Sequence, residues 1–521
     1  MADGSRSSSS GRETPAWVRW AMPSVADLIF VALLCVLVFT PFSVRLLGDA
    51  GIGWHIRTGQ QILATHAVPH VDSFSSTMAG KPWFAWEWLY DVLVGQLEAT
   101  LALNGVVWFT AIVIAAVFAW TFRLLIARGT QICVALGLVL LAFSAATIHF
   151  LARPHVVSWL FTLAWFWILD SSERDDPARN RWLWFLPPLM LLWVNLHGGW
   201  LLGFVLLGIF WLGAVWTWFK AKGNRLEDSL RKIAAAKQAS RLTWVTLLSA
   251  LASLANPYGW RLHAHVASYL SNRFLMDHID EFQSPNFHGI AQKCFLVLLL
   301  ITLAALAIHG RALRMSEGLT ALFAVYAGLY ASRNIPVSAV LLVMVLGPLL
   351  SSRAPGKGFF QRMRDMELKM QGHAWPVLAI VFTLYIASSR GRLDSTLLMN
   401  AHFDPHRMPA DAVNYLVNHE VKGPVLSPDF WGGYLIYRLY PKEQVVVDDR
   451  HDLYGEQFFR SYLKLIHAEP GWDDFLREHA NSCVLLPKQS PLASLLTQSA
   501  EWKSIYADDA AVVFVRRQEH P

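Results

Sequence analysis

Long apolar stretches recur along this chain, and they constrain its fold more than any other feature of the sequence. A helix needs about 20 apolar residues to cross the hydrocarbon core of a bilayer. Hydrophobic residues make up 54% of the 521 residues and charged residues 16%, whereas a soluble domain is about 25% charged. The chain is therefore predicted to be a polytopic α-helical membrane protein, which excludes a disordered chain, a disulfide scaffold and an ordinary soluble enzyme. Eleven spans are expected, at residues 25–46, 104–126, 132–150, 155–170, 182–197, 199–219, 242–256, 294–309, 316–332, 334–350 and 374–389.

The basic residues between these stretches predict the orientation. Seven Lys and Arg residues lie in 220–241 and five in 351–373, and both segments fall on the same side of the membrane if all eleven stretches span. Loops rich in Lys and Arg stay in the cytoplasm. We expect an inner-membrane protein with a cytoplasmic N-terminus and a periplasmic or extracellular C-terminus. The net charge of +6 is thereby explained, and without a basic face or a nucleic-acid motif a nucleic acid is not expected as a partner.

Three regions are expected along the chain. Residues 1–22 begin with a Ser-rich run and are predicted to be a disordered cytoplasmic tail. Residues 23–389 form the transmembrane module, with a long external loop at 48–103 whose two ends are predicted to be amphipathic interfacial helices. Residues 390–521 are expected to form an extracytoplasmic α/β domain. There PVLSPDF, QVVVDD, NSCVLLP and AAVVFVRR are predicted strands, alternating with helices at DAVNYLVNH, EQFFRSYLKLIH and WDDFLREHA.

Polar residues crowd into the external loop at 48–103. Asp49 directly follows the first apolar stretch, and His55, Arg57, Asp72 and Glu87 come after it. A carboxylate at the membrane surface can deprotonate an acceptor hydroxyl or bind a divalent cation. The structural alternatives are that Asp49 caps the helix in GIGWHIRTGQQIL, that Asp72 makes a turn, and that the others lie on the polar face of an interfacial helix.

Further polar residues stand at the predicted outer ends of the spans. Arginine binds phosphate in a bidentate manner, so outer arginines beside a carboxylate suit a lipid-phosphate substrate, although each could instead extend to the headgroups. In the C-terminal region, Asp449 ends a predicted strand, and Gly432-Gly433 serves a turn or a close backbone approach. Trp431 and Asp449 are expected to face the membrane. The expected substrate-binding residues are Arg57, Asp72, Arg153, His155, His197, Arg261, Arg333, Trp431 and Asp449.

The sequence resembles the GT-C membrane glycosyltransferases in its plan: one span, a large external loop that opens on an acidic residue, many further spans and an external C-terminal domain. In LLGDAGIGWHIRTGQ, Asp49 takes the place of that family's essential Asp. The stretch VLSPDFWGGYLIYRLYPKEQVVVDDRHDLYG is similar to the oligosaccharyltransferase catalytic subunit around its aromatic-acidic-glycine turn. The resemblance implies a polyprenyl-phosphate-linked sugar donor.

On this resemblance Asp49 would be the base, Arg153 and Arg333 would stabilise the phosphate, and His55 and Glu87 would support them. A cofactor is unknown, with a divalent cation such as Mg or Mn as one possibility. The acceptor would be a glycan, a lipid or a protein. Two other functions stay open: a transporter or flippase of a lipid-linked glycan, and a non-catalytic membrane scaffold.

Overall fold

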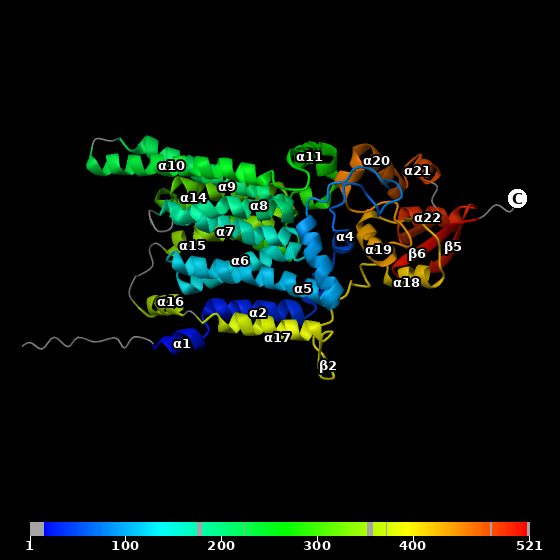
Figure 1. Ribbon diagram of the computed structural model, residues 1–521, viewed down its shortest axis with the longest axis horizontal. Coiled ribbons are helices and arrows are strands. Elements are labelled where there is room, and N and C mark those ends of the chain that lie inside the picture. Colours follow the sequence, from blue (N-terminus) through cyan, green and yellow to red (C-terminus); the bar gives the residue numbers. More distant parts are fainter. Residues whose placement is uncertain are drawn as a thin grey trace, which may run out of the picture.

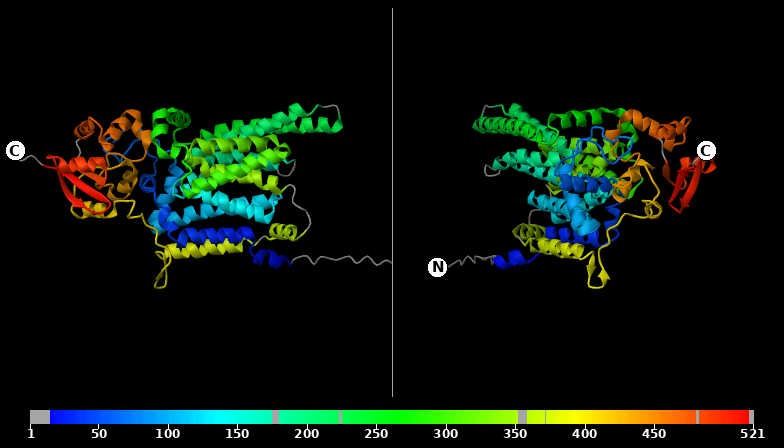
Figure 2. Two further views of the ribbon diagram at one scale, coloured as in Figure 1. Left: turned by 180° about the vertical axis from the view of Figure 1, so that it is seen from behind. Right: turned by 45° about the vertical axis from the view of Figure 1, so that its right-hand side comes forward.

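The computed structural model describes residues 15–174, 180–222, 225–351, 358–370, 372–479 and 482–517. Its long helices run side by side in a bundle, and the C-terminal region, coloured orange to red, sits on one end of that bundle (Figure 1). The short helix α1 (Ala16–Ala21) lies near the other end. The views from behind and from an oblique angle show the same arrangement (Figure 2).

A helix covers each of the eleven apolar stretches. Within the described residues, six helices are long and apolar enough to cross a membrane, or seven if α16 (Phe359–Lys369) and α17 (Ala374–Ser388), bent by 61°, make one span. A multi-pass helical architecture is therefore present, while the number eleven stays a prediction. The other bundle helices are α2 (Val25–Phe39), α5 (Trp88–Ala127), α6 (Ile132–Ala146), α7 (His155–Glu173), α8 (Leu186–Leu196), α9 (Leu201–Lys220), α10 (Leu226–Ser253), α13 (Ile290–His309), α14 (Met315–Tyr330) and α15 (Ile335–Ser351).

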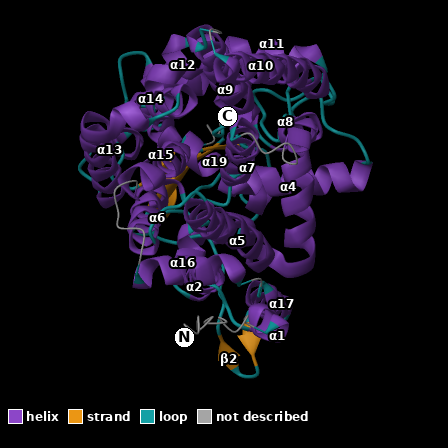
Figure 3. Cartoon of the chain, turned by 90° about the vertical axis from the view of Figure 1, so that its left-hand side faces the viewer, coloured by secondary structure: helices purple, strands orange, loops and turns teal. Residues whose placement is uncertain are grey.

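Seen along the bundle, α15 lies inside and α13, α14, α9 and α10 lie around it, while α2 and α17 form the opposite edge (Figure 3). Helix α15 is apolar on all sides, with Val, Leu and Met at successive positions, and nearly all of its residues are buried. A helix that is hydrophobic all round is stable only inside a protein or a membrane. The sequence of α15 thus accounts for its central place.

Helix α3 (Phe42–Arg45) ends just before the external loop, and the predicted amphipathic helix at the start of that loop is α4 (Ile52–Thr65). At its other end the predicted second helix is the first part of α5, which leaves helical geometry at Ala102 (φ 54°, ψ −159°) before the spanning part begins. Two further helices, α11 (Trp260–Ser271) and α12 (Arg273–His278), lie between α10 and α13.

The expected tail is partly corrected. Residues 1–14 lie outside the described part, but the six residues of α1 are helical rather than disordered. The tryptophans of α1, Trp17 and Trp20, are exposed. Tryptophan side chains are enriched at the headgroup level of a bilayer. The two tryptophans therefore suit a helix at the membrane surface better than a disordered tail in water.

The C-terminal region combines strands and helices. A four-stranded sheet has the order β3-β4-β6-β5, in which β3 and β4 are parallel and the other pairs antiparallel. A small hairpin of β1 (Arg392–Leu393) and β2 (Thr396–Leu397) precedes it. The remaining elements are β3 (Val425–Leu426), β4 (Cys483–Pro487), β5 (Trp502–Ala507), β6 (Ala511–Arg516), α18 (Ala410–Asn418), α19 (Asp429–Leu439), α20 (His451–Ile466), α21 (Trp472–Glu478) and α22 (Pro491–Gln498).

One local expectation in this region is wrong, and for a second the structure decides between two alternatives. The predicted strand in QVVVDD makes only isolated bridges, from Val445 to Ser75 and to Val425. Gly432-Gly433 forms no turn but lies inside α19. Glycine is unfavourable within a helix, yet here it allows close contact: a Cβ on Gly433 would lie 2.3 Å from the carbonyl oxygen of Ala50. The expected close backbone approach is therefore present, and it holds α19 against the start of α4.

The hydrophobic core is continuous between the bundle and the C-terminal region. One cluster of buried side chains includes Leu34 and Phe118 of the bundle as well as Leu435 and Leu485. A second cluster, under α20, α21 and the sheet, takes in Met78 of the external loop. The described residues beyond 390 are thus packed onto the external segments of the bundle, and their independence as a domain stays a prediction.

Candidate active site

A cavity of about 1100 Å³ lies between the end of the bundle and the C-terminal region. Its walls come from the first external loop, the segments that join the bundle helices at that end, and the segment after Val447. One part of the wall is apolar, with Trp159, Leu201 and Val337, and another part is strongly polar. The cavity therefore combines an apolar surface with groups that can bind charge.

Three carboxylates converge on one guanidinium at the polar wall. Arg153 Nη1 lies 2.9 Å from Glu281 Oε1 and 3.4 Å from Asp49 Oδ2, and its Nη2 lies 3.1 Å from Asp449 Oδ2. Arg153 stands just before α7, and Glu281 lies in the 3₁₀-helix η4 (Asp280–Phe282). Because Arg153 Nη1 and Nη2 belong to one rigid planar group, this arrangement fixes the three carboxylates relative to each other.

Backbone and ring donors orient the same carboxylates. Asp49 Oδ1 accepts the N–H of Gly51 at 2.7 Å just before α4, whose N-cap is Gly51, so Asp49 makes a turn and does not cap the helix. Asp49 also lines the cavity. Trp54 Nε1 donates to Asp449 Oδ1 at 3.0 Å. About a quarter (26%) of the Asp49 side chain is exposed. Asp49 is thus held firmly and still accessible to a molecule in the cavity.

The electrostatics separate the other two carboxylates. Burial raises the pKa of Asp449 to about 7, against the opposing charge of Arg153. Burial also acts to raise the pKa of Glu281, but the charges of Arg153 and Arg333 outweigh it and leave that pKa well below its usual range. Glu281 is therefore ionised at neutral pH, whereas Asp449 titrates there.

A second polar group lies deeper, around Glu87. Glu87 is 3.7 Å from His55 Nε2 and 3.6 Å from His197 Nε2. The other ring nitrogen of His55 is 2.6 Å from Asp91, and that of His197 is 2.7 Å from Ser158 Oγ. Burial raises the pKa of Glu87 to about 8 and lowers that of His55 well below its usual value. Glu87 is therefore mainly protonated and His55 neutral at neutral pH, so Glu87 suits a proton donor better than a base.

Arg333 supplies a positive charge on another wall of the cavity. Its guanidinium stacks 4.6 Å from the ring centre of Phe282, and in the described part of the chain no carboxylate lies within ion-pair distance of it. His155 also lines the cavity, and its Nε2 is 2.9 Å from the carbonyl oxygen of His149. An arginine without a carboxylate partner in a cavity is available for an anionic ligand.

No protein-family model and no curated protein matches the sequence. Among the solved structures with a similar fold is the oligosaccharyltransferase of Archaeoglobus fulgidus in complex with Zn and sulfate. It aligns over 94% of this chain and 72% of its own, with 10% identity and a TM-score of 0.54. The AglB oligosaccharyltransferase of A. fulgidus, in complex with an inhibitory peptide and a dolichol-phosphate, covers 95% and 74%, with 11% identity and a TM-score of 0.50. ArnT of Cupriavidus metallidurans, bound to undecaprenyl phosphate, covers 94% and 98%, with 13% identity and a TM-score of 0.50.

The chain has the GT-C glycosyltransferase fold. The resemblance that the sequence suggested is thereby confirmed for the fold. Within this GT-C fold, eight of the predicted site residues line one cavity: Asp49, His55, Glu87, Arg153, His155, His197, Arg333 and Asp449.

Four predicted substrate-binding residues do not line that cavity. Arg57 Nε donates to the carbonyl oxygen of Tyr437 at 3.0 Å and so binds α4 to α19. Asp72 is fully buried in an ion pair, 2.7 Å from Arg450 Nη1. Arg261 lies exposed at the start of α11. Trp431 is buried in α19 and donates its Nε1–H to the carbonyl oxygen of Arg407 at 2.8 Å.

Several cavity residues lay beyond sequence reasoning. Glu281 stands in an irregular segment with no pattern that sets it apart from its neighbour Asp280. Asp429 Oδ2 lies 2.7 Å from His451 Nε2, and its Oδ1 accepts the hydroxyl of Tyr462 at 2.9 Å. Burial acts to lower the pKa of His451, but the hydrogen bond and charge of Asp429 outweigh it, and the net pKa is raised. For Asp429, the only sequence feature that pointed to this region was the string DFWGG, residues 429–433.

Metal binding has no preformed site in this part of the GT-C fold. Over the described residues, no group of three His, Cys, Asp or Glu side chains is arranged to hold a metal ion. The three carboxylates nearest one another share Arg153 instead. Binding of a divalent cation, one possibility raised by the sequence, stays a prediction.

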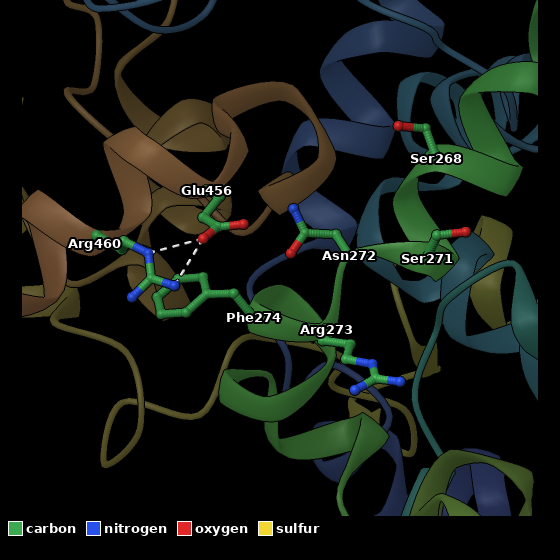
Figure 4. A pocket seen from close by; sticks show the side chains of 7 residues that line it. All are labelled: Ser268, Ser271, Asn272, Arg273, Phe274, Glu456 and Arg460. Atoms are coloured by element: carbon green, nitrogen blue, oxygen red, sulfur yellow. Dashed lines mark hydrogen bonds and ion pairs between the residues drawn. The ribbon is translucent and has the colours of Figure 1, made fainter.

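A second depression lies outside this cavity, between α11, α12 and α20 (Figure 4). Arg460 stacks 3.7 Å from the ring centre of Phe274 and pairs with Glu456 at 2.7 Å, so its charge is already neutralised. Arg273 extends away from these groups in Figure 4. The groups of this depression do not converge on a common point, which leaves the large cavity as the candidate active site.

Proposed function

We propose that the protein is a membrane glycosyltransferase, which moves a sugar from a polyprenyl-phosphate donor to an acceptor hydroxyl at the outer face of the inner membrane. One observation carries this proposal: a single cavity joins an accessible carboxylate, Asp49, to an arginine without a carboxylate partner, Arg333, and to an apolar wall. The bound dolichol-phosphate and undecaprenyl phosphate of the neighbouring structures support the choice of a lipid-phosphate donor.

The donor would lie across the cavity. Its lipid chain would contact the apolar wall around Trp159, Leu201 and Val337, where apolar burial is favourable. Its phosphate would pair with Arg333, whose planar guanidinium matches two phosphate oxygens. The sugar would then extend toward the polar wall that carries Asp49 and Arg153.

The reaction would be a displacement at the anomeric carbon. The acceptor oxygen attacks C1 while Asp49 takes its proton, the bond between C1 and the phosphate oxygen breaks, and the lipid phosphate leaves with the bonding electrons. Asp49 can act in this way because Gly51 and Arg153 fix its orientation and its side chain still reaches the cavity. Arg333 stabilises the charge that grows on the leaving phosphate.

The test is a transfer assay with the purified full chain, a panel of polyprenyl-phosphate sugars, and glycan, lipid and protein acceptors. Asp49→Asn should lower the transfer rate about 10²- to 10⁴-fold, because an amide cannot take the acceptor proton. Asp509→Asn, at a fully exposed site away from the cavity, is the matched control and should keep the rate.

Two outcomes would replace the proposal. Movement of a lipid-linked glycan across vesicles without sugar transfer would identify a transporter or flippase. If a well-folded protein neither transfers sugar nor moves the lipid-linked glycan, a non-catalytic scaffold would be the remaining function. Transfer by Asp49→Asn at the wild-type rate would remove Asp49 from the mechanism.

A further inference from the structure

The carboxylates of Asp49, Glu281 and Asp449 come from three separate segments and surround one side chain. Their oxygens lie 3.4, 2.9 and 3.1 Å from the terminal nitrogens of Arg153. Three like charges brought so close repel one another unless a cation lies between them. In many proteins that cation is a divalent metal ion, which binds carboxylate oxygens at about 2.0–2.6 Å. Here the guanidinium stands between them.

A metal ion and the guanidinium cannot share this place. Arg153 Nη1 lies within 3.4 Å of oxygens from both Asp49 and Glu281. An ion bound to those two oxygens would lie next to Nη1, and its double positive charge would repel the guanidinium strongly at that distance. Only one of the two cations can occupy the space between the carboxylates, and in this structure the guanidinium of Arg153 occupies it.

The hydrogen bonds that orient Asp49 and Asp449 leave one oxygen of each carboxylate for the guanidinium. One oxygen of Asp49 accepts the N–H of Gly51, and one oxygen of Asp449 accepts the Nε1–H of Trp54. Each of these carboxylates therefore presents a single oxygen to Arg153. One guanidinium can therefore make charge-assisted contacts with all three carboxylates, each through one oxygen.

We propose that Arg153 takes the place of a divalent cation in this cavity and that the protein needs no metal ion to hold its acidic residues together. Arg153 is then a positioning residue: it sets the orientation of Asp49 through the Nη1 contact and keeps Glu281 and Asp449 beside it. The inference concerns the same cavity as the proposed function, but its main test measures metal binding and does not depend on sugar transfer.

The experiment titrates Mn²⁺ into the purified, tag-free full chain in detergent at pH 8, and follows bound Mn²⁺ by electron paramagnetic resonance. The wild type should bind no Mn²⁺ in the cavity. Arg153→Ala removes the guanidinium and leaves the three carboxylates, so its affinity for Mn²⁺ should rise at least about tenfold. The double variant Arg153→Ala with Glu281→Gln should lose that gain.

Matched variants separate the effect from a general loss of charge. Arg333→Ala removes another arginine of the cavity, one without a carboxylate partner, and should gain no Mn²⁺ binding. Arg153→Lys keeps a positive charge among the carboxylates and should also gain none. In the transfer assay, the wild type should keep its activity after dialysis against a chelator.

Mn²⁺ binding by the wild type that Glu281→Gln weakens would overturn the inference, and this measurement needs no variant at Arg153. An unchanged affinity in folded Arg153→Ala would overturn it as well, as would loss of wild-type transfer on chelation with recovery on adding Mn²⁺. Failure to transfer sugar from every donor would overturn the proposed function and leave the Mn²⁺ result standing.

Discussion

Asp449 Oδ2 lies 3.1 Å from Arg153 Nη2, although 296 residues separate the two in the chain. Arg153 belongs to the end of the bundle and Asp449 to the C-terminal region. The cavity is therefore built between two parts of the chain, and its geometry depends on how firmly they are held together.

The contact between α19 and α4 should depend on Gly433. Its Cβ would lie 2.3 Å from the carbonyl oxygen of Ala50, so Gly433→Ala forces the two backbones apart, at a cost of about 1–3 kcal/mol. We expect a lower melting temperature and faster tryptic cleavage after Arg407. Gly137→Ala, in α6 with open space around its Cβ, is the control and should change neither. Equal protease resistance in both variants would contradict the role of Gly433.

Arg450 should be essential for stability. It lies 2.7 Å from Asp72 and 2.7 Å from Asp448, all three are buried, and its guanidinium stacks 4.6 Å from the ring centre of Trp83. Arg450→Met leaves two carboxylates buried without a cation, which typically costs about 3–5 kcal/mol. Arg477→Met removes an exposed pair and should leave the melting temperature unchanged. Thermal unfolding followed by Trp fluorescence measures both, and a wild-type melting temperature for Arg450→Met would refute the prediction.

Glu87 should make stability depend on pH. Its pKa rises from 4.5 to about 8 on folding, so the folded chain holds this proton more tightly than the unfolded chain. The stabilisation is fully present below pH 4.5 and is lost as the pH rises through 8, and each pH unit in that window is worth up to about 1.4 kcal/mol. Glu87→Gln cannot lose a proton there. Its melting temperature should match the wild type at pH 5 and exceed it increasingly toward pH 9; parallel curves would contradict the assignment.

Arg333 should act on donor binding. The loss of one charge-assisted contact to phosphate is worth about 1.5–3 kcal/mol, or roughly 10- to 150-fold. In a transfer assay, Arg333→Gln should reduce kcat/KM for the polyprenyl-phosphate donor by that factor, with the KM for the acceptor unchanged. Arg261→Gln, exposed at the start of α11 and away from the cavity, is the matched control and should keep the wild-type value. The same loss in both variants would point to a general effect of charge.

The orientation in the membrane is testable with reporter fusions. Arg225 directly precedes α10 and Arg517 directly follows β6, and these two elements lie in opposite parts of the molecule in Figure 1. A fusion after Arg225 should report the cytoplasm and a fusion after Arg517 the exterior, because the basic segment at 220–241 stays inside. A cytoplasmic signal from the fusion after Arg517 would overturn the predicted topology.

Much of this architecture could be predicted from the apolar stretches and from the polar residues at their ends. The apolar run 334–350 predicts a membrane-spanning helix, and α15 covers it with the length and composition of a span. Asp49, Arg153 and Arg333 stand where an apolar stretch ends, so their place near one membrane surface follows from the sequence, and the cavity contains all three.

Pairing between distant segments was beyond the sequence. Asp72 and Asp49 look alike in the external loop, and only Arg450, 378 residues away from Asp72, makes one of them a buried structural group. Gly432-Gly433 predicts either a turn or a close backbone approach, and only the position of Ala50 in the fold decides for the close approach. Glu281 joins Arg153 from a segment without periodicity, so no local rule marks it.

The order of synthesis adds a consequence to the cluster around Arg153. Its members enter the nascent chain as Asp49, Arg153, Glu281 and, last, Asp449. Until the ribosome has passed Asp449, two acidic side chains face the guanidinium and the wall formed by the C-terminal region is absent. A chain synthesised up to the end of α17 thus has every bundle helix but lacks Asp449, so the site can be completed only after synthesis of the membrane part has ended.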